Sequence, residues 1–195
     1  MITIPTPPFL STIKSLIRLS GNEERIARDL FKPLILRSGE YFLQQGELCR
    51  YVGLIESGLV RYYMTDDGEQ KTMYFSKEGE FVSNYQSFLP REPSNINIQA
   101  IEDTAMQVIS FENLQRLYAT VSEGNKLGRL GIEHVYLTSL QQLKSFYQDS
   151  PTARYQQFLQ AYPDLVQRVP QYYIASYVGI KPQSLSRIRK RLAGR

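Results

Sequence analysis

The segment from residue 171 to residue 190 has the residue pattern of a helix-turn-helix. Ile174 and Val178 lie one helical turn apart, which predicts that both face a core. Ala175 is small, so a second helix can cross closely at that point. Gly179 falls where the turn between two helices needs a residue that tolerates positive φ. We therefore expect a pair of crossed helices near the carboxyl end of the sequence.

The second helix of this motif is predicted to bury one side and to expose a polar, basic side. Ile180, Leu185 and Ile188 supply the buried stripe, and Pro182 suits the first turn because its missing N–H has no intrahelical partner there. A recognition helix that enters the DNA major groove requires such an outer face. A surface hairpin with a basic face is the alternative, but the apolar, small, glycine and basic positions together favour DNA binding. The residues predicted to contact DNA are Lys181, Gln183, Ser184, Ser186, Arg187, Arg189, Lys190 and Arg191.

The charge distribution also favours a nucleic-acid partner. No acidic residue follows Asp164, whereas seven basic residues do, the last of them Arg195. Since the whole chain carries +4, residues 1–164 carry −3. Clustered Lys and Arg are typical of proteins that bind a phosphate backbone. A membrane surface is the weaker alternative, because this segment lacks the broad apolar face that an interfacial helix inserts.

Length and composition set the class of protein. At 195 residues the chain can bury one good core and a small second domain. No apolar run approaches the length of a membrane span, and residues 1–8 lack the basic and apolar regions of a secretory signal. The single cysteine, Cys49, allows no internal disulfide. These features predict a cytoplasmic protein.

The first half of the chain changes from helical to β patterning. Residues 9–31 are predicted to be helical, with Ser20 and Glu23 forming a capping box. Residues 32–117 hold short β-branched and aromatic runs separated by glycines at nearly regular intervals. Within them, Asp67 and Gly68 predict a tight hairpin turn. Many short, evenly spaced strands are typical of a β-roll or jelly roll.

Residues 125–148 are predicted to form the longest helix, with apolar residues on two sides. One side of this helix holds Ile132, Val135, Tyr136, Leu140, Leu143, Phe146 and Tyr147. The other side holds Leu127, Leu130 and Leu137. A helix that is apolar on two sides needs two partners, and we expect these to be the β-roll and the same helix of a second copy. Burial within a monomer is the alternative.

Several short motifs follow one another in a characteristic order along the chain. They are Gly39 and Glu40; Gln45, Gly46 and Glu47; Ile55 and Gly58; Asp67, Gly68 and Glu69; Arg154; and Ala175, Gly179 and Arg187. In this order, between initial helices and a terminal helix-turn-helix, they resemble the cyclic-nucleotide-receptor/fumarate-nitrate-reduction (Crp/Fnr) family of bacterial transcription regulators. The resemblance covers nearly the whole chain.

The resemblance implies an α+β fold with three parts. Residues 1–124 are expected to form a cyclic-nucleotide-binding-like β-roll, residues 125–148 a dimerisation helix, and residues 149–195 a DNA-binding domain. The β-hairpin wing that usually follows the recognition helix is expected to be missing. The implied function is non-enzymatic: a homodimer would regulate transcription by binding a pseudo-palindromic site in double-stranded DNA, with RNA polymerase and an unknown effector as further partners.

The sequence departs from the family where the cyclic nucleotide would bind. The family's Gly-Glu pair, whose Glu holds the ribose, is replaced by Ser83 and Asn84. In the family, an Arg that neutralises the phosphate is followed by a small residue, and these two positions hold Ser94 and Asn95 here. An anionic phosphate without an Arg partner is poorly held. We therefore expect these four residues to line an effector pocket that binds no cyclic AMP, and any ligand to be neutral or weakly charged.

Other cofactors and an enzymatic role are disfavoured by the residue counts. An iron–sulfur cluster generally needs four thiolates, and the chain has one cysteine. Haem would have to use His134 or Cys49, but a lone histidine on a helix is more often packed than a ligand. A redox role for Cys49 beside Arg50 stays a weak option. A cupin-like metalloenzyme or small-molecule-binding β-roll without DNA function is the main rival, and a single histidine disfavours its metal site.

Overall fold

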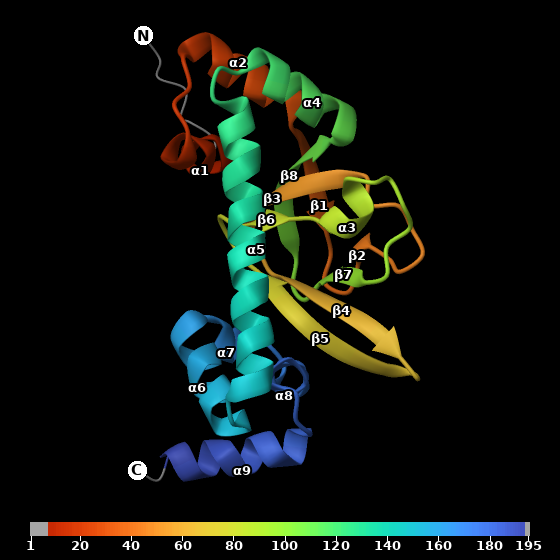
Figure 1. The fold of residues 1–195 in the computed structure, drawn as a ribbon, viewed down its shortest axis with the longest axis vertical. Helices are drawn as coiled ribbons and strands as arrows, with labels where there is room; N and C mark the ends of the chain where they lie inside the picture. The colour runs from red at the N-terminus through yellow and green to blue at the C-terminus, as the bar shows by residue number, and fades with distance from the viewer. Residues whose placement is uncertain (1–7, 194–195) are drawn as a thin grey trace. The chain divides into compact units, whose positions relative to one another are not determined.

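Two four-stranded sheets form the β-roll predicted for residues 32–117 (Figure 1). In the computed structural model, which describes residues 8–193, their strand orders are β1-β8-β3-β6 and β2-β7-β4-β5. The first sheet contains β1 (Lys32–Leu36), β3 (Tyr51–Ser57), β6 (Phe81–Val82) and β8 (Thr104–Ser110). The second contains β2 (Tyr41–Leu43), β4 (Val60–Asp66), β5 (Glu69–Ser76) and β7 (Asn97–Ala100).

The chain divides into two compact units. One contains the chain up to Tyr62 together with Phe75–Val135, and the other contains Tyr63–Tyr74 together with the chain from Tyr136 onward. The tip of the β4–β5 hairpin thus belongs to the same unit as the helix-turn-helix. None of the helices described between residues 8 and 193 is long and apolar enough to cross a membrane.

The core of the first unit is centred on β3, in which the four consecutive residues 52–55 are all buried. Antiparallel pairing of β3 with β8 sets Val52 opposite Ile109 and Ile55 opposite Met106, and all four side chains are buried. Val52 and Ile55 are three residues apart and therefore point to opposite faces of the sheet, so both faces of β3 are covered.

Two turns require a positive φ. Asp67 (φ 49°) and Gly68 (φ 79°) join β4 to β5, which is the type I′ geometry expected for a two-residue hairpin loop. Gly58 has a φ of 103°, and a Cβ there would lie 2.6 Å from the Cα of Thr104. A side chain at this position would collide with the backbone of β8, so only glycine fits.

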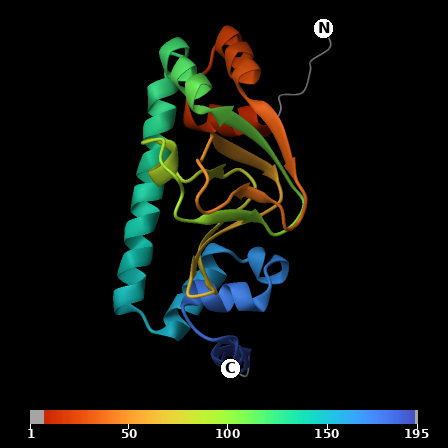
Figure 2. The same ribbon diagram turned by 90° about the vertical axis from the view of Figure 1, so that its right-hand side faces the viewer.

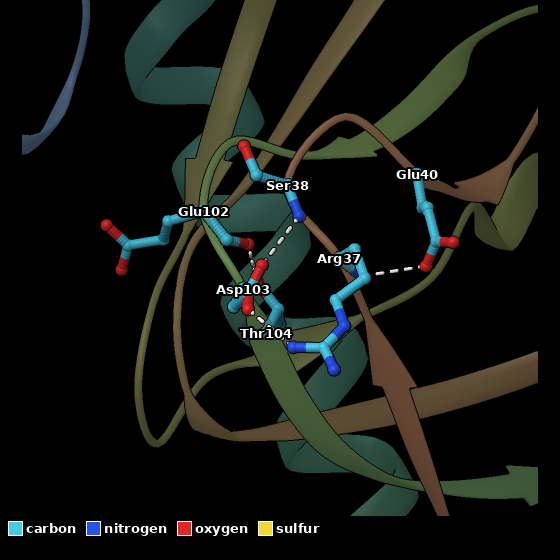
Figure 3. A network of polar contacts seen from close by, with 6 residues as sticks. All are labelled: Arg37, Ser38, Glu40, Glu102, Asp103 and Thr104. Carbon is cyan, nitrogen blue, oxygen red and sulfur yellow. Dashed lines mark hydrogen bonds and ion pairs between the residues drawn. The ribbon is translucent and has the colours of Figure 1, made fainter.

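A network of polar contacts holds the β1–β2 turn against the β7–β8 turn (Figure 3). The Arg37 guanidinium donates to Asp103 over 2.8 Å, and the Ser38 amide donates to the same carboxylate over 2.9 Å. These bonds hold the pKa of Asp103 below its usual value. The Glu40 carboxylate accepts from the Arg37 amide over 2.7 Å and closes the first turn.

Helices cover one end of this roll (Figures 1 and 2). They are α1 (Pro8–Leu16), α2 (Gly21–Leu30) and α4 (Phe111–Thr120), while the single turn α3 (Tyr85–Phe88) follows β6. The predicted capping box at the start of α2 is confirmed, since Ser20 and Glu23 cap each other's backbone amides. Helix α2 packs against α4 and buries Ala27 and Leu30, whereas Ile26 stays half-buried.

The predicted long helix is α5 (Gly124–Gln148). Leu127 is buried and Leu130 half-buried, but Leu137 is 64% exposed, so the side that these three residues share is covered only at its beginning. All the apolar residues predicted for the other side are 40–84% exposed, namely Ile132, Val135, Tyr136, Leu140, Leu143, Phe146 and Tyr147. Helix α5 thus carries a long apolar face that is largely exposed in the described chain.

Up to residue 193, where the described chain ends, four helices complete the second unit. They are α6 (Pro151–Ala161), α7 (Leu165–Arg168), α8 (Gln171–Val178) and α9 (Pro182–Ala193). Their core includes Tyr155, Phe158 and Leu165, all buried. The aromatic rings of Phe158, Tyr162 and Tyr177 lie within 6.3 Å of one another, measured between centroids.

Candidate nucleic-acid interface

Helices α8 and α9 form the predicted helix-turn-helix. Ile174, Ala175 and Val178 of α8 have no exposed surface, and Leu185 and Ile188 of α9 are 1% and 8% exposed. Ile180 does not extend the buried stripe of α9 as predicted. It lies half-buried in the turn, because α9 begins at Pro182.

The turn between the helices depends on Gly179. Its φ is 75°, and its amide donates to carbonyls in the last turn of α8. The Ile180 amide then donates to the Ala175 carbonyl over 2.9 Å. This is the left-handed glycine cap that ends many helices, and it confirms the role predicted for Gly179.

The outer side of α9 presents the polar and basic residues. Seven of the eight predicted DNA contacts are exposed and Ser184 is half-buried. Gln183, Arg187 and Lys190 lie on the side opposite Leu185 and Ile188, since residues three and four apart share a helix face. Figure 1 shows α9 lying across the end of the α6–α8 cluster. A helix held in this way can present its outer side to a groove.

Two arginines near this face have contacts that sequence patterning does not reveal. The Arg191 guanidinium donates to the Thr152 hydroxyl of α6 over 2.7 Å. Arg168 lies 3.7 Å from Asp164, which offsets its charge. The neutral Thr152 hydroxyl leaves the charge of Arg191 in place, so the positive charge in and just before α9 is carried by Lys181, Arg187, Arg189, Lys190 and Arg191. Arg195, also counted in the basic terminus, lies outside the described residues.

The four residues predicted to line an effector pocket are divided by the fold. Asn84 and Ser94 are buried and adjacent: the Asn84 amide donates to the Ser94 hydroxyl over 2.9 Å. Ser94 in turn donates to the Ile96 carbonyl over 2.7 Å. Ser83 is half-buried and Asn95 is exposed. Asn84 and Ser94 are thus close in space, but their buried polar groups form hydrogen bonds with each other and with the backbone.

Comparison with known proteins supports the same architecture. Residues 33–121 match the family model of the cyclic nucleotide-binding domain. FixK2 from Bradyrhizobium japonicum is similar with a TM-score of 0.72 at 16% identity, over 84% of this chain and 85% of that chain. The c-di-GMP responsive global regulator CLP of Xanthomonas campestris has a TM-score of 0.69 at 17% identity, over 90% and 92% of the two chains.

The catabolite activator protein of Thermus thermophilus is similar with a TM-score of 0.55 at 22% identity, over 90% of this chain and 84% of that chain. The chain has the Crp/Fnr fold. No curated protein matches the sequence. The predicted fold class, an α+β protein with a cyclic-nucleotide-binding-like β-roll and a terminal helix-turn-helix, is confirmed.

Arg91 precedes Ser94 by three residues in this Crp/Fnr fold, but its guanidinium has other partners. Arg91, in the loop before β7, has a φ of 62°. Its guanidinium lies over the Phe111 ring, 5.4 Å from the centroid, and 3.9 Å from the Glu112 carboxylate. Arg91 borders an open hollow of about 360 Å³ with Arg50 and Tyr51. A cation–π contact with Phe111 and an ion pair with Glu112 thus engage the Arg91 guanidinium.

The candidate haem and redox residues have ordinary surroundings. Within residues 8–193 no group of three or more His, Cys, Asp or Glu side chains is placed to hold a metal ion. His134 is exposed on α5. Cys49 is 1% exposed, and its sulfur lies 3.5 Å from both the Ser83 hydroxyl and the Asn84 amide. A buried thiol among neutral hydrogen-bonding groups is typical of a structural cysteine.

A contact that sequence reasoning missed joins the first helix of the motif to the hairpin tip. The Ser176 hydroxyl of α8 accepts from the Thr72 amide over 2.8 Å and donates to the Gln70 carbonyl over 3.0 Å. One side chain thus satisfies two backbone groups at the edge of β5. Gln142 of α5 donates to the Met73 carbonyl of the same strand over 3.0 Å. No sequence pattern signals these pairs, because their members lie far apart in the chain.

Proposed function

We propose that the chain is a homodimeric, DNA-binding transcription regulator of the Crp/Fnr type and not an enzyme. The observation that carries the proposal is the outer side of α9, where Gln183, Arg187 and Lys190 face solvent above a fully formed helix-turn-helix core. Side chains of these types read base edges and bind phosphates in the major groove. The regulator from Xanthomonas campestris shares the fold.

The proposed dimer rests on α5. Ile132, Tyr136, Leu143 and Tyr147 recur with helical spacing along one side, and each is at least 40% exposed. An apolar stripe of this length on one helix is suited to pairing with a second copy in a parallel coiled coil. Such pairing would present two recognition helices to half-sites about one helical turn of DNA apart.

The proposed sensor does not use cyclic AMP. Asn84 and Ser94 offer neutral hydrogen-bonding groups that already bond to each other, and no arginine lies at the two cassette pairs, Ser83–Asn84 and Ser94–Asn95. A cyclic phosphate buried there would lack a charged partner. We propose that any effector is neutral or weakly charged.

Selection of bound sequences from random double-stranded DNA, followed by gel-shift titration across a salt series, tests the proposal. We expect a two-fold symmetric motif and an affinity that falls steeply with salt, because phosphate binding releases counterions. As a matched control, removal of Arg25 and Arg28 from α2 should leave the affinity unchanged, whereas removal of Arg187 and Lys190 should abolish site selection. Recovery of no motif, together with weak salt-independent binding, would refute the proposal.

A further inference from the structure

One arginine joins three helices of the second unit. Arg154 lies in the first turn of α6, and its Nε donates to the Val178 carbonyl over 2.8 Å. Its Nη1 donates to the Asp149 carbonyl over 2.7 Å. Val178 is the last residue of α8, and Asp149 directly follows α5. Both carbonyls belong to helix ends that lack intrahelical donors, so a single guanidinium caps the two helices together.

The same guanidinium is stacked on α5. Its central carbon lies 5.3 Å from the centroid of the Phe146 ring, which is the range of a cation–π contact. A Cβ built on Gly179 would lie 3.0 Å from a Phe146 ring carbon and 3.6 Å from the Arg154 Nη2. The turn of the helix-turn-helix is therefore packed directly against the Arg154–Phe146 pair.

We infer that Arg154 is a positioning residue that fixes the angle between the end of α5 and the helix-turn-helix. Lysine cannot replace it, because a point-charged ammonium lacks the planar fork that donates to two carbonyls while stacking on a ring. In the proposed dimer this angle sets the distance between the two recognition helices and hence the preferred half-site spacing. That second consequence rests on the proposed function, whereas the angle itself does not.

The experiment measures the angle first. Nitroxide labels on Lys144→Cys of α5 and Ser186→Cys of α9 report the distance between the two helices by pulsed spin resonance, with excess unlabelled chain to isolate pairs within one protomer. In Arg154→Met and Arg154→Lys we expect the distance distribution to widen about twofold, since a region without its tie samples more conformations. The control is Gln156→Met, an exposed residue of the same helix, and its distribution should match that of the parent.

Phe146→Leu keeps both hydrogen bonds and removes the stacking surface, so it should widen the distribution less than Arg154→Met. It also keeps the test decisive if circular dichroism shows that Arg154→Met does not fold. Unchanged distributions in folded Arg154→Lys and Phe146→Leu proteins would overturn the inference.

A second arm uses DNA. The half-site selected by the parent protein is placed twice in duplexes at graded separations, and the affinity ratio between the best and the neighbouring spacing is measured. We expect Arg154→Lys, which keeps the charge, to lose most of this ratio while retaining half-site preference. If the parent binds no DNA, the proposed function fails, and the distance measurement alone decides the role of Arg154.

Discussion

At the scale of single residues, Glu23 links two parts of the first unit that are distant in sequence. Its carboxylate accepts from the Ser20 amide over 2.7 Å and from the Ser122 amide over 2.7 Å. Hydrogen bonds from Ser122 and Ser20 lower the pKa of Glu23 from 4.5 to about 2. The carboxylate thus caps α2 and also holds the segment that precedes α5.

The lowered pKa predicts an acid-sensitive contribution to folding. A group whose pKa is lowered on folding stabilises the protein at a pH above its pKa in the unfolded chain. This contribution is lost as the pH falls through the pKa of the group in the folded protein. We expect Glu23→Gln to lower the melting temperature near neutral pH, and the difference from the parent to vanish between pH 4.5 and about 2. Glu133→Gln, which breaks an exposed ion pair with Arg129, should change the melting temperature little at any pH. Equal melting temperatures of parent and Glu23→Gln at neutral pH would contradict the role of Glu23.

A second prediction at this scale separates base reading from phosphate binding on α9. Arg187 lies opposite the buried stripe, where a guanidinium can pair bidentately with guanine. We expect Arg187→Ala to cost about 1–3 kcal/mol on the selected site and to relax base preference at one position per half-site. Arg189 lies on the flank of the helix, so Arg189→Ala should weaken all sequences evenly. An unchanged base-preference profile in Arg187→Ala would count against the assignment.

At the scale of elements, the exposure of apolar residues changes along α5. Leu127, near its beginning, is 5% exposed, whereas Leu137 is 64% exposed. Ile132, Tyr136 and Leu143 are spaced by four and seven residues and so form one exposed apolar stripe. Leu137 lies on another side of the helix, so we expect the dimer interface along the stripe rather than through Leu137.

This division predicts which substitutions dissociate the proposed dimer. Replacing Ile132 and Leu143 with Glu puts two like charges on the stripe of each copy, and we expect monomers by light scattering at micromolar concentration, with weakened DNA binding. Leu137→Glu introduces the same chemistry off the stripe and should leave the dimer intact. A monomeric parent protein, or dissociation by Leu137→Glu alone, would place the interface elsewhere.

At the scale of the whole molecule, a β-roll of the cyclic-nucleotide-binding type and a helix-turn-helix occur in one chain with opposite charge. Residues 1–164 carry a net charge of −3, and all the charge after Asp164 is positive. A mildly acidic body repels the DNA backbone, so we expect DNA to be contacted through α9 and its flanks alone.

The choice of effector is also predicted at the scale of the whole molecule. We expect neither cyclic AMP nor cyclic GMP to bind at tens of micromolar by calorimetry, since the cassette positions offer no charged partner for the phosphate. A neutral nucleoside tested in parallel isolates the contribution of the phosphate. A dissociation constant of about one micromolar for either cyclic nucleotide would overturn the prediction, and Arg91→Ala would then show whether the Arg91 guanidinium reaches the phosphate.

Features that depend on short stretches of chain could be predicted from the sequence. The capping box at Ser20, the type I′ turn at Asp67 and Gly68, the left-handed cap at Gly179 and the buried stripe of α8 each follow from backbone energetics within a few residues. The order of the motifs then identified the fold, and the polar side of α9 followed from helical periodicity.

The folded structure was needed to show which groups far apart in the sequence are in contact. It closed Asn84 and Ser94 on each other, set Ser176 against the edge of β5, and placed Arg154 between the ends of α5 and α8. It also decided that Leu137 stays exposed while Leu127 is buried, although both belong to one predicted face. The physical reason is that such contacts depend on how distant elements pack, and local propensity carries no information about packing partners far away in the sequence.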